Sequence, residues 1–284
     1  IPAYKAMGDK VKIVAVADIR EEAAKETAER HGIPKYYVDP YKMLEEEKPD
    51  IISVCTPNAY HKEYTLAGFR VGCHVVCEKP VAVTCADAEE MFNAAEKAGK
   101  HLFVIQSLRF TGNFKAAAGL AKSGCLGDIY YADLNLVRRR GVPRWGMFHM
   151  AKENVGGAFC DLGVHMCDYL MSISGNPKMV SVSGSAVTRI VNKEKNIEFS
   201  NAESGAPTGL FTPRKFDMKE FDVEEFANGY IRLENGMTVT FKISWALNLP
   251  NSNTVSICGD KGGLTIGDDG LKLLCLLYTS PSPR

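Results

Sequence analysis

The sequence has 284 residues, of which 45% are hydrophobic, so it is long enough to bury a substantial core in one large domain or two ordinary ones. Its 34 basic and 34 acidic side chains cancel, which leaves no net field to attract nucleic acid or an anionic membrane. No apolar stretch approaches the roughly 20 residues that a membrane helix needs. We therefore expect a soluble globular protein whose partners include neither nucleic acid nor membrane.

The first part of the chain alternates apolar strands with helical patterns. Continuous apolar strands are predicted at residues 11–18, 49–57, 74–80 and 101–107. The helical patterns between them cover residues 20–32, 61–72 and 85–100. Such an alternation is typical of a parallel sheet covered on both faces, so residues 1–107 are predicted to form a Rossmann-type nucleotide-binding domain.

From residue 108 the pattern changes. Strands are predicted at 128–140 and 180–187, a helix at 156–174, and a hairpin at 229–245 whose turn is Asn235-Gly236. These elements predict an α+β domain over 108–274 with a large, mostly antiparallel open sheet.

Both ends depart from a complete nucleotide-binding fold. The phosphate-binding GxGxxG motif is absent, and residues 1–10 resemble the end of a helix that leads into a second strand. We therefore expect the chain to be a fragment that lacks the first strand and the glycine-rich loop. Residues 275–284 break the preceding pattern and are predicted to be a non-native tail.

The cysteines do not form a zinc motif. There are nine, an odd number, without CxxC pairs. We interpret them as reduced thiols, which favours the cytoplasm, and we predict no metal site. They are Cys55, Cys73, Cys77, Cys85, Cys125, Cys160, Cys167, Cys258 and Cys275.

Two charged residues follow the first predicted strand. Asp18 stands at its carboxyl end, where a dinucleotide-binding domain places an acid that accepts hydrogen bonds from the adenosine ribose. The carboxylate would repel a 2′-phosphate and so favours NAD over NADP, whereas a guanidinium at Arg20 suits a phosphate or an adenine ring. An Asp in this position is also an ordinary helix cap, and Asp18 alone does not decide between the two.

Two further strand ends carry polar residues, Thr-Pro-Asn at 56–58 and Glu-Lys-Pro at 78–80. Ligands of open parallel sheets bind outside the carboxyl ends of the strands, so these segments and Asp18 are predicted to line one crevice. Taken singly, each segment is more simply explained as a polar turn or a helix cap.

The helix predicted at 156–174 carries Asp161 and His165 four residues apart on a stripe that continues to Asp168 and Ser172. A carboxylate and an imidazole that project together suit proton transfer, and the alternative is a solvated ion pair. Two ligands at this spacing lack an evident third, so metal binding is not predicted. The apolar face is predicted to consist of Phe159, Leu162, Met166, Tyr169, Leu170 and Ile173.

These segments, in this order and at this spacing, resemble the Gfo/Idh/MocA oxidoreductases, a family named for glucose-fructose oxidoreductase and inositol dehydrogenase. The resemblance runs from about residue 2 to residue 274. It rests on the segments AVADIREEAAKETAERHGI, DIISVCTPNAYH, CEKPVAVT, GGAFCDLGVHMCDYL and FANGYIRLENGMTVTFKISW. It implies a Rossmann domain followed by a domain with an open sheet, through which family members form homo-oligomers.

The resemblance also implies roles for individual residues. Lys79, Asp161 and His165 match the catalytic positions of the family. Arg109 and Trp145 fall where substrate or cofactor contacts are expected. The residues implied to hold the cofactor, with Arg20 added from its place beside Asp18, are Asp18, Arg20, Thr56, Pro57, Asn58, His61, Glu78 and Gln106.

For the longer protein of which the chain is expected to be a fragment, the sequence thus predicts an NAD-dependent oxidoreductase that transfers a hydride between the cofactor and a secondary hydroxyl of a sugar, polyol or cyclic derivative. An alcohol is too weak an acid to lose its proton unaided, so we expect His165 to take it. Lys79 would hydrogen-bond the same oxygen, and Asp161 would orient substrate or imidazole. Two alternatives remain open, an NAD-dependent glycoside hydrolase of the same family and a non-catalytic nucleotide-binding protein.

Overall fold

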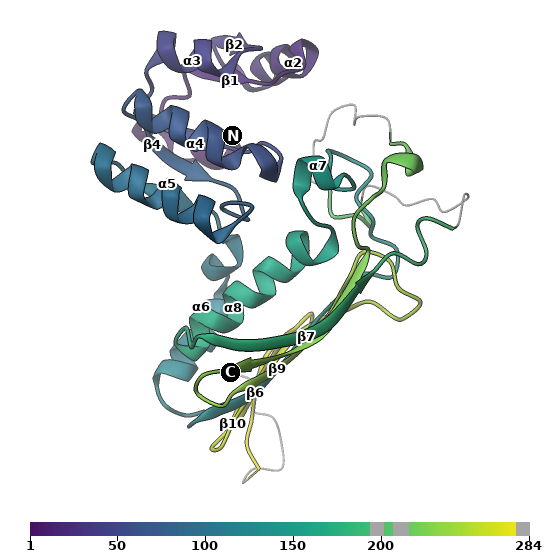
Figure 1. The fold of residues 1–284 in the computed structure, drawn as a ribbon. Coiled ribbons are helices and arrows are strands. Elements are labelled where there is room, and N and C mark those ends of the chain that lie inside the picture. The colour runs from purple at the N-terminus through teal and green to yellow at the C-terminus, as the bar shows by residue number, and fades with distance from the viewer. Residues whose placement is uncertain (194–201, 207–215, 277–284) are drawn as a thin grey trace. The chain divides into compact units, whose positions relative to one another are not determined.

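The computed structural model describes residues 1–193, 202–206 and 216–276. It divides into two compact units, residues 1–105 and 106–284, each with its own hydrophobic core (Figure 1). Among the described residues, no helix is both long enough and apolar enough to cross a bilayer. The predicted tail at 275–284 lies almost wholly outside the described residues and stays a prediction.

The first unit alternates short strands and helices in chain order. Its strands are β1 (Ala15–Ala17), β2 (Lys35–Tyr37), β3 (Ile51–Val54), β4 (His74–Cys77) and β5 (Leu102–Val104). Its helices are α1 (Pro2–Lys5), α2 (Glu21–His31), α3 (Pro40–Glu47), α4 (His61–Arg70) and α5 (Cys85–Ala98), with 3₁₀ turns η1 (Gly8–Lys10) and η2 (Asn58–Tyr60).

The strands of this unit form two parallel sheets, β1-β2 and β3-β4-β5. The strand predicted at 11–18 is shorter in the structure, because β1 pairs only over the three residues that β2 offers. Helices α4 and α5 pack on β3-β4-β5 and bury Val54 and Val75. On the other face Ile51 and Phe103 are about half exposed, and the Tyr4 hydroxyl of α1 lies 2.7 Å from that of Ser53, so this face is covered only in part.

The local sequence explains where these helices start and stop. Thr84 caps α5 by accepting a hydrogen bond from the backbone N–H of Asp87, 3.1 Å away. Helices α2 and α5 both end at a glycine with a left-handed backbone, Gly32 at φ +57° and Gly99 at φ +63°, the conformation that glycine adopts most readily.

The second unit pairs a large sheet with a helical layer. Its strands are β6 (Ile129–Val137), β7 (Met179–Val187), β8 (Phe226–Leu233), β9 (Thr238–Ser244), β10 (Ser252–Gly259), β11 (Gly263–Gly267) and β12 (Gly270–Leu274). Its helices are α6 (Gly112–Lys122), α7 (Ala151–Asn154) and α8 (Val164–Ser174), with 3₁₀ turns η3 (Ser107–Phe110) and η5 (Met218–Glu220) and a π-helical turn η4 (Phe159–Gly163).

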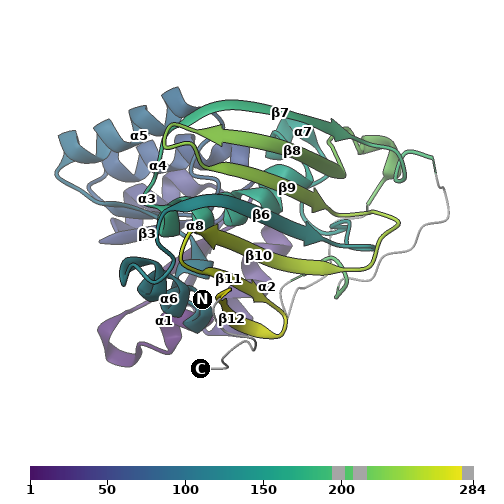
Figure 2. The same cartoon turned by 90° about the horizontal axis from the view of Figure 1, so that it is seen from below.

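The seven strands lie in the order β12-β11-β10-β6-β9-β8-β7, and every pair is antiparallel except β6-β9 (Figure 2). The predicted α+β fold with a mostly antiparallel sheet is therefore confirmed. The predicted hairpin is β8-β9, and its turn residue Gly236 has φ +83°. Helices α6 and α8 lie on one face, and the opposite face is open among the described residues (Figure 1).

The two faces of this sheet differ in chemistry because side chains alternate along each strand. Leu134, Val239 and Ile257 point into the core on the helix side and are almost fully buried. The predicted apolar face of the helical segment meets them, with Leu162, Met166, Tyr169, Leu170 and Ile173 buried and Phe159 packed against the same core.

Candidate active site

Asp18 and Arg20 contact each other at the end of β1. The Asp18 carboxylate accepts a hydrogen bond from the backbone N–H of Arg20 at 2.9 Å, and the guanidinium lies 3.5 Å from the same oxygen. Both side chains are more than one third exposed. The carboxylate therefore stays accessible to a ligand hydroxyl, as the ribose-binding prediction requires.

The loop after β3 is tied to the loop after β4 by His61, the first residue of α4. His61 is fully buried, and its Nδ1 lies 2.7 Å from the carbonyl oxygen of Pro80 while its Nε2 lies 3.0 Å from that of Thr56. The ring leaves no surface for direct contact with a cofactor. This burial favours an indirect role in which His61 fixes the two loops that carry Thr56 and Lys79.

Within these loops, Pro57 precedes the 3₁₀ turn that begins at Asn58. The Thr56 hydroxyl is buried without a hydrogen-bond partner among the described residues. A buried hydroxyl left in this state costs free energy, so it marks a place that a ligand or water completes.

Lys79 follows β4 and is half-buried. Its backbone N–H donates to the Glu78 carboxylate at 3.2 Å, and the peptide bond between Lys79 and Pro80 is cis. The backbone N–H of Glu78 in turn donates to Val54 at 3.0 Å, which continues the parallel ladder to this point. The strand thus delivers the Lys79 side chain from a fixed backbone position.

In the second unit, Asp161 and His165 stand on one helical segment, but the helix is not uniform. Asp161 lies in the π-helical turn and His165 in α8, so one extra residue is accommodated near Asp161. Such insertions occur often at functional sites because they redirect side chains. The residues of the predicted stripe accordingly bond to different partners, Asp161 to Trp245 and Asp168 to Arg109.

A residue that directly follows a strand of the sheet hydrogen-bonds the Asp161 carboxylate. The indole N–H of Trp245 donates to its Oδ2 at 3.1 Å, and Trp245 is fully buried just after β9. Burial lowers the pKa of the nearby Arg138 guanidinium, and the negative charge of Asp161 opposes that shift. Neither Trp245 nor Arg138 was predicted, although both belong to this site.

Arg109 is engaged by the next acid on the stripe. Its Nε and Nη2 donate to the two carboxylate oxygens of Asp168 at 2.8 and 2.5 Å. This fork geometry raises the pKa of Arg109 and anchors η3 to α8. The Arg109 side chain is still 45% exposed, so its predicted substrate contact stays compatible with the ion pair.

Trp145 shares a partner with Arg138. The Trp145 indole donates to the Ser204 hydroxyl at 3.2 Å, and Arg138 donates to the Ser204 carbonyl at 2.9 Å. Ser204 is almost fully buried. Segment 202–206 is therefore anchored beside the strand end that carries Arg138.

Comparison with known proteins then decides the family. A model of the oxidoreductase family's NAD-binding Rossmann fold matches residues 1–106, and a model of the GFO/IDH/MocA C-terminal domain matches residues 114–265. The chain belongs to the Gfo/Idh/MocA oxidoreductase family. Its first unit is thus of the NAD-binding Rossmann type, and the predicted family is confirmed.

Relatives of this Gfo/Idh/MocA chain include D-glucoside 3-dehydrogenase of Escherichia coli K12, 35% identical over 266 residues that cover 93% of this chain and 72% of the relative. Two solved structures share the fold. Levoglucosan dehydrogenase with NADH and levoglucosan has a TM-score of 0.78 and 20% identity, covering 99% of this chain and 74% of that one. Aldose-aldose oxidoreductase from Caulobacter crescentus with glycerol has a TM-score of 0.77 and 24% identity, covering 99% and 78%.

The residues present fit a dinucleotide at several points. The Asp18 carboxylate is accessible after β1, and the Thr56 hydroxyl is buried without a partner. The Gln106 side-chain oxygen is likewise buried without a partner in the described parts of the chain. No cluster of three or more potential metal ligands occurs among the described residues.

Proposed function

We propose that this Gfo/Idh/MocA protein oxidises a secondary hydroxyl of a sugar, polyol or cyclic derivative with NAD. The observation that carries the substrate class is the 35% identity to D-glucoside 3-dehydrogenase, which extends over 93% of the chain. The accessible Asp18 carboxylate supports NAD over NADP, because it would repel a 2′-phosphate. When bound, the nicotinamide ring accepts the hydride.

Residues of the chain would remove the proton of the substrate hydroxyl and stabilise the charge that develops on its oxygen. His165 takes the proton from the substrate hydroxyl, since a positioned base contributes about 10²- to 10⁴-fold to such a step. The Lys79 ammonium stabilises the negative charge that develops on the same oxygen. Asp161, whose Oδ2 accepts from Trp245, orients the substrate or the imidazole.

The cofactor would be held by the strand ends of the first unit. Asp18 would accept from the ribose hydroxyls, with Arg20 beside it. Thr56 and Asn58 would bind the cofactor through side-chain hydroxyl and amide groups, and Glu78 through its carboxylate. Pro57, Gln106, Arg109 and Trp145 keep their predicted roles as contacts to cofactor or substrate.

A panel of glycosides, free sugars and polyols with NAD tests the proposal through NADH absorbance. We expect NADH to accumulate with at least one secondary alcohol and to depend on His165. Glycoside cleavage without net NADH would instead support a hydrolase that retains the cofactor. NAD binding that is unaffected by loss of His165, with no turnover of any compound, would support a nucleotide-binding protein.

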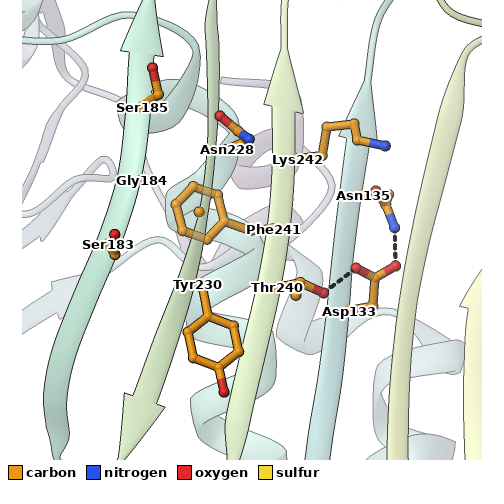
Figure 3. A pocket seen from close by; sticks show the side chains of 11 residues that line it. Asp133, Asn135, Ser183, Gly184, Ser185, Asn228, Tyr230, Thr240, Phe241 and Lys242 are labelled. Carbon is orange, nitrogen blue, oxygen red and sulfur yellow. Dashed lines mark hydrogen bonds between the residues drawn. The ribbon is translucent and has the colours of Figure 1, made fainter.

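We also propose that the open face of the sheet contacts a second copy of the chain. A polar cluster lies there, in which the Asp133 carboxylate accepts from Asn135 and from Thr240, the latter at 2.5 Å (Figure 3). Thr240 also lies 2.8 Å from the Tyr131 hydroxyl. In a twofold dimer the same half-buried cluster of both copies would face itself, so its hydrogen-bonding groups could pair across the contact.

Light scattering tests the interface. The Ser185→Arg change places a charge on the open face at β7, where the residue is exposed. We expect it to dissociate the oligomer, whereas Asn113→Arg, an exposed position on α6, should not. Equal oligomer mass in both variants would contradict the proposed interface.

The nine cysteines support a reducing location. All of them are free thiols. Burial raises the pKa of Cys77 to about 12 and that of Cys167 to about 11, so neither forms a reactive thiolate at neutral pH. We propose a cytoplasmic protein, which fractionation of the source cells would test.

A further inference from the structure

Trp245 is a fully buried residue whose only side-chain hydrogen-bonding group, the indole N–H, donates to Oδ2 of Asp161 at 3.1 Å. We propose that Trp245 is a positioning residue that fixes the direction of the Asp161 carboxylate for the oxidation of the substrate hydroxyl. This inference rests on the proposed function, because it assigns Trp245 a task only through the role of Asp161.

The indole is itself held in place. The backbone N–H of Trp245 donates to Glu225 at 2.8 Å, and its carbonyl accepts from Gly141 at 2.7 Å. The ring of Phe221 packs edge-on against the indole, with centroids 6.4 Å apart. A side chain with both backbone groups bonded and no exposed surface cannot swing away, so the donor keeps a fixed position.

The backbone that carries Asp161 is fixed by a second residue, Glu224. Its two carboxylate oxygens accept from the N–H groups of Gly157 at 2.8 Å and Phe159 at 2.9 Å, and its carbonyl accepts from Ala158 at 3.0 Å. One residue therefore satisfies three successive N–H groups at the start of the helical segment, which otherwise lack partners.

The approach between these segments is close enough to require glycine. A Cβ on Gly157 would lie 1.9 Å from the backbone oxygen of Glu224. The absence of a side chain at Gly157 thus allows the first turn of the helical segment to pack directly against Glu224. Glu224 then sets the position of the Asp161 backbone, and Trp245 sets the rotation of its carboxylate.

The consequence is specific to one hydrogen bond. An indole donates but does not accept, so it can pair only with an oxygen of Asp161 and fixes one torsion of the carboxylate. A hydrogen bond to a charged group contributes about 1.5–3 kcal/mol, so misdirection of the carboxylate is expected to lower kcat by about 10- to 100-fold. KM should change less, because binding of the remaining substrate groups is untouched.

The first experiment compares three variants by steady-state kinetics. Trp245→Phe removes the N–H but also some volume. Replacement of Trp245 by 3-benzothienylalanine removes the N–H and keeps the shape, because sulfur takes the place of the nitrogen. Leu264→Val removes a buried methylene group from β11, which lies three strands from β9 in the sheet, and leaves the contacts of the indole intact, so it serves as the control for lost stability.

We expect both changes at Trp245 to lower kcat by about 10- to 100-fold with KM nearly constant, and Leu264→Val to lower the melting temperature without that loss. If 3-benzothienylalanine retains the wild-type kcat, the indole N–H does not position Asp161 and the inference is overturned.

A second measurement separates this inference from the proposed function. The protein contains two tryptophans, so its indole N–H groups give two resonances in a ¹⁵N-correlated NMR spectrum. Asp161→Ala should shift the Trp245 resonance and leave that of Trp145 in place. An unmoved Trp245 resonance would refute the contact, whereas wild-type protein that oxidises no alcohol would refute only the proposed function.

Discussion

The candidate catalytic residue of the first unit, Lys79, stands on a loop that follows a parallel strand, whereas Asp161 and His165 of the second unit stand on a helical segment. Loops after strands present carbonyl oxygens, and the side chain that ties them is an imidazole, His61, with a nitrogen facing each of two carbonyls. The start of a helix presents N–H groups, and the side chain that ties it is a carboxylate, Glu224. The polarity of the exposed backbone thus selects the chemistry of the residue that holds it.

The two units also differ in how many hydrogen bonds each of these side chains makes, and this number sets how much stability its replacement should cost. Glu224 and its neighbour Glu225 each collect several N–H groups, and Glu225 alone accepts from Arg189, Ile190 and Val191 at 2.6–2.8 Å. His61 has two contacts, and a neutral imidazole can donate in only one of them. We therefore expect replacement of Glu224 or Glu225 to lower the stability of the second unit more than replacement of His61 lowers that of the first.

The largest effect is expected from Lys79, the lysine of the first unit that is proposed to be catalytic. Lys79→Ala should lower kcat by about 10²- to 10³-fold, because a preorganised donor to the developing oxyanion is lost. NADH formation measures this, and the melting temperature should stay close to that of the wild type. The control is Lys97→Ala, an exposed position on α5. Turnover near the wild-type rate would remove Lys79 from the mechanism.

The anchor in the second unit should come next. Glu225→Ala leaves the N–H groups of Arg189, Ile190 and Val191 without acceptors. The bond from Val191 is buried and the other two are part-buried, so at up to about 1 kcal/mol each we expect the free energy of unfolding to fall by about 2–3 kcal/mol. Both tryptophans lie in this unit, so urea denaturation followed by tryptophan fluorescence reports on it.

The matched control is Glu234→Ala. Glu234 is exposed and accepts a backbone N–H from Lys178 at 2.9 Å, so its loss should cost less than about 1 kcal/mol. Equal destabilisation by the two changes would mean that the number of buried N–H groups does not determine the anchor's strength.

The sequence predicted those parts of the fold in which a local pattern determines the outcome. The apolar face of the helical segment and the β8-β9 hairpin both follow from side-chain spacing and from Asn235-Gly236. Helix α3 went unpredicted although Asp39 and Pro40 form a standard helix start. Strands β10 to β12 were missed too, because they are short and their sequences contain Gly, Ser and Asn, which are common in turns.

The site was predicted less completely, because its geometry depends on contacts between distant positions. Trp245 is 84 residues from Asp161, and Arg109 is 59 from Asp168. A single sequence contains no signal that pairs such residues. The burial of His61 is likewise invisible in the sequence, where the residue is simply the polar start of a helix.

The link that His61 forms between the loops at 56–58 and 78–80 can be removed by mutation and restored by a small molecule. His61→Gly should raise amide exchange in segments 56–58 and 78–80 by about 10-fold, since both loops lose a partner. Added imidazole should fill the cavity and restore protection, as measured by hydrogen exchange and mass spectrometry. 1-Methylimidazole, in which a methyl group blocks one nitrogen, is the control and should fail. Unchanged exchange in His61→Gly would show that the loops are held by other contacts.

The smallest effect is expected where a helix end is held by local contacts alone. Thr84 accepts from the Asp87 N–H, and its hydroxyl donates to the Asp87 carboxylate at 2.7 Å. Thr84→Ala should cost about 1 kcal/mol, seen as faster amide exchange in the first turn of α5, because the cap is lost. Thr84→Ser keeps the hydroxyl and should stay near the wild type. If Thr84→Ala also matched the wild type, the helix start would depend on the Asp87–Lys62 ion pair, which joins α5 to α4 at 2.7 Å, and a tertiary contact would hold this end of the first unit.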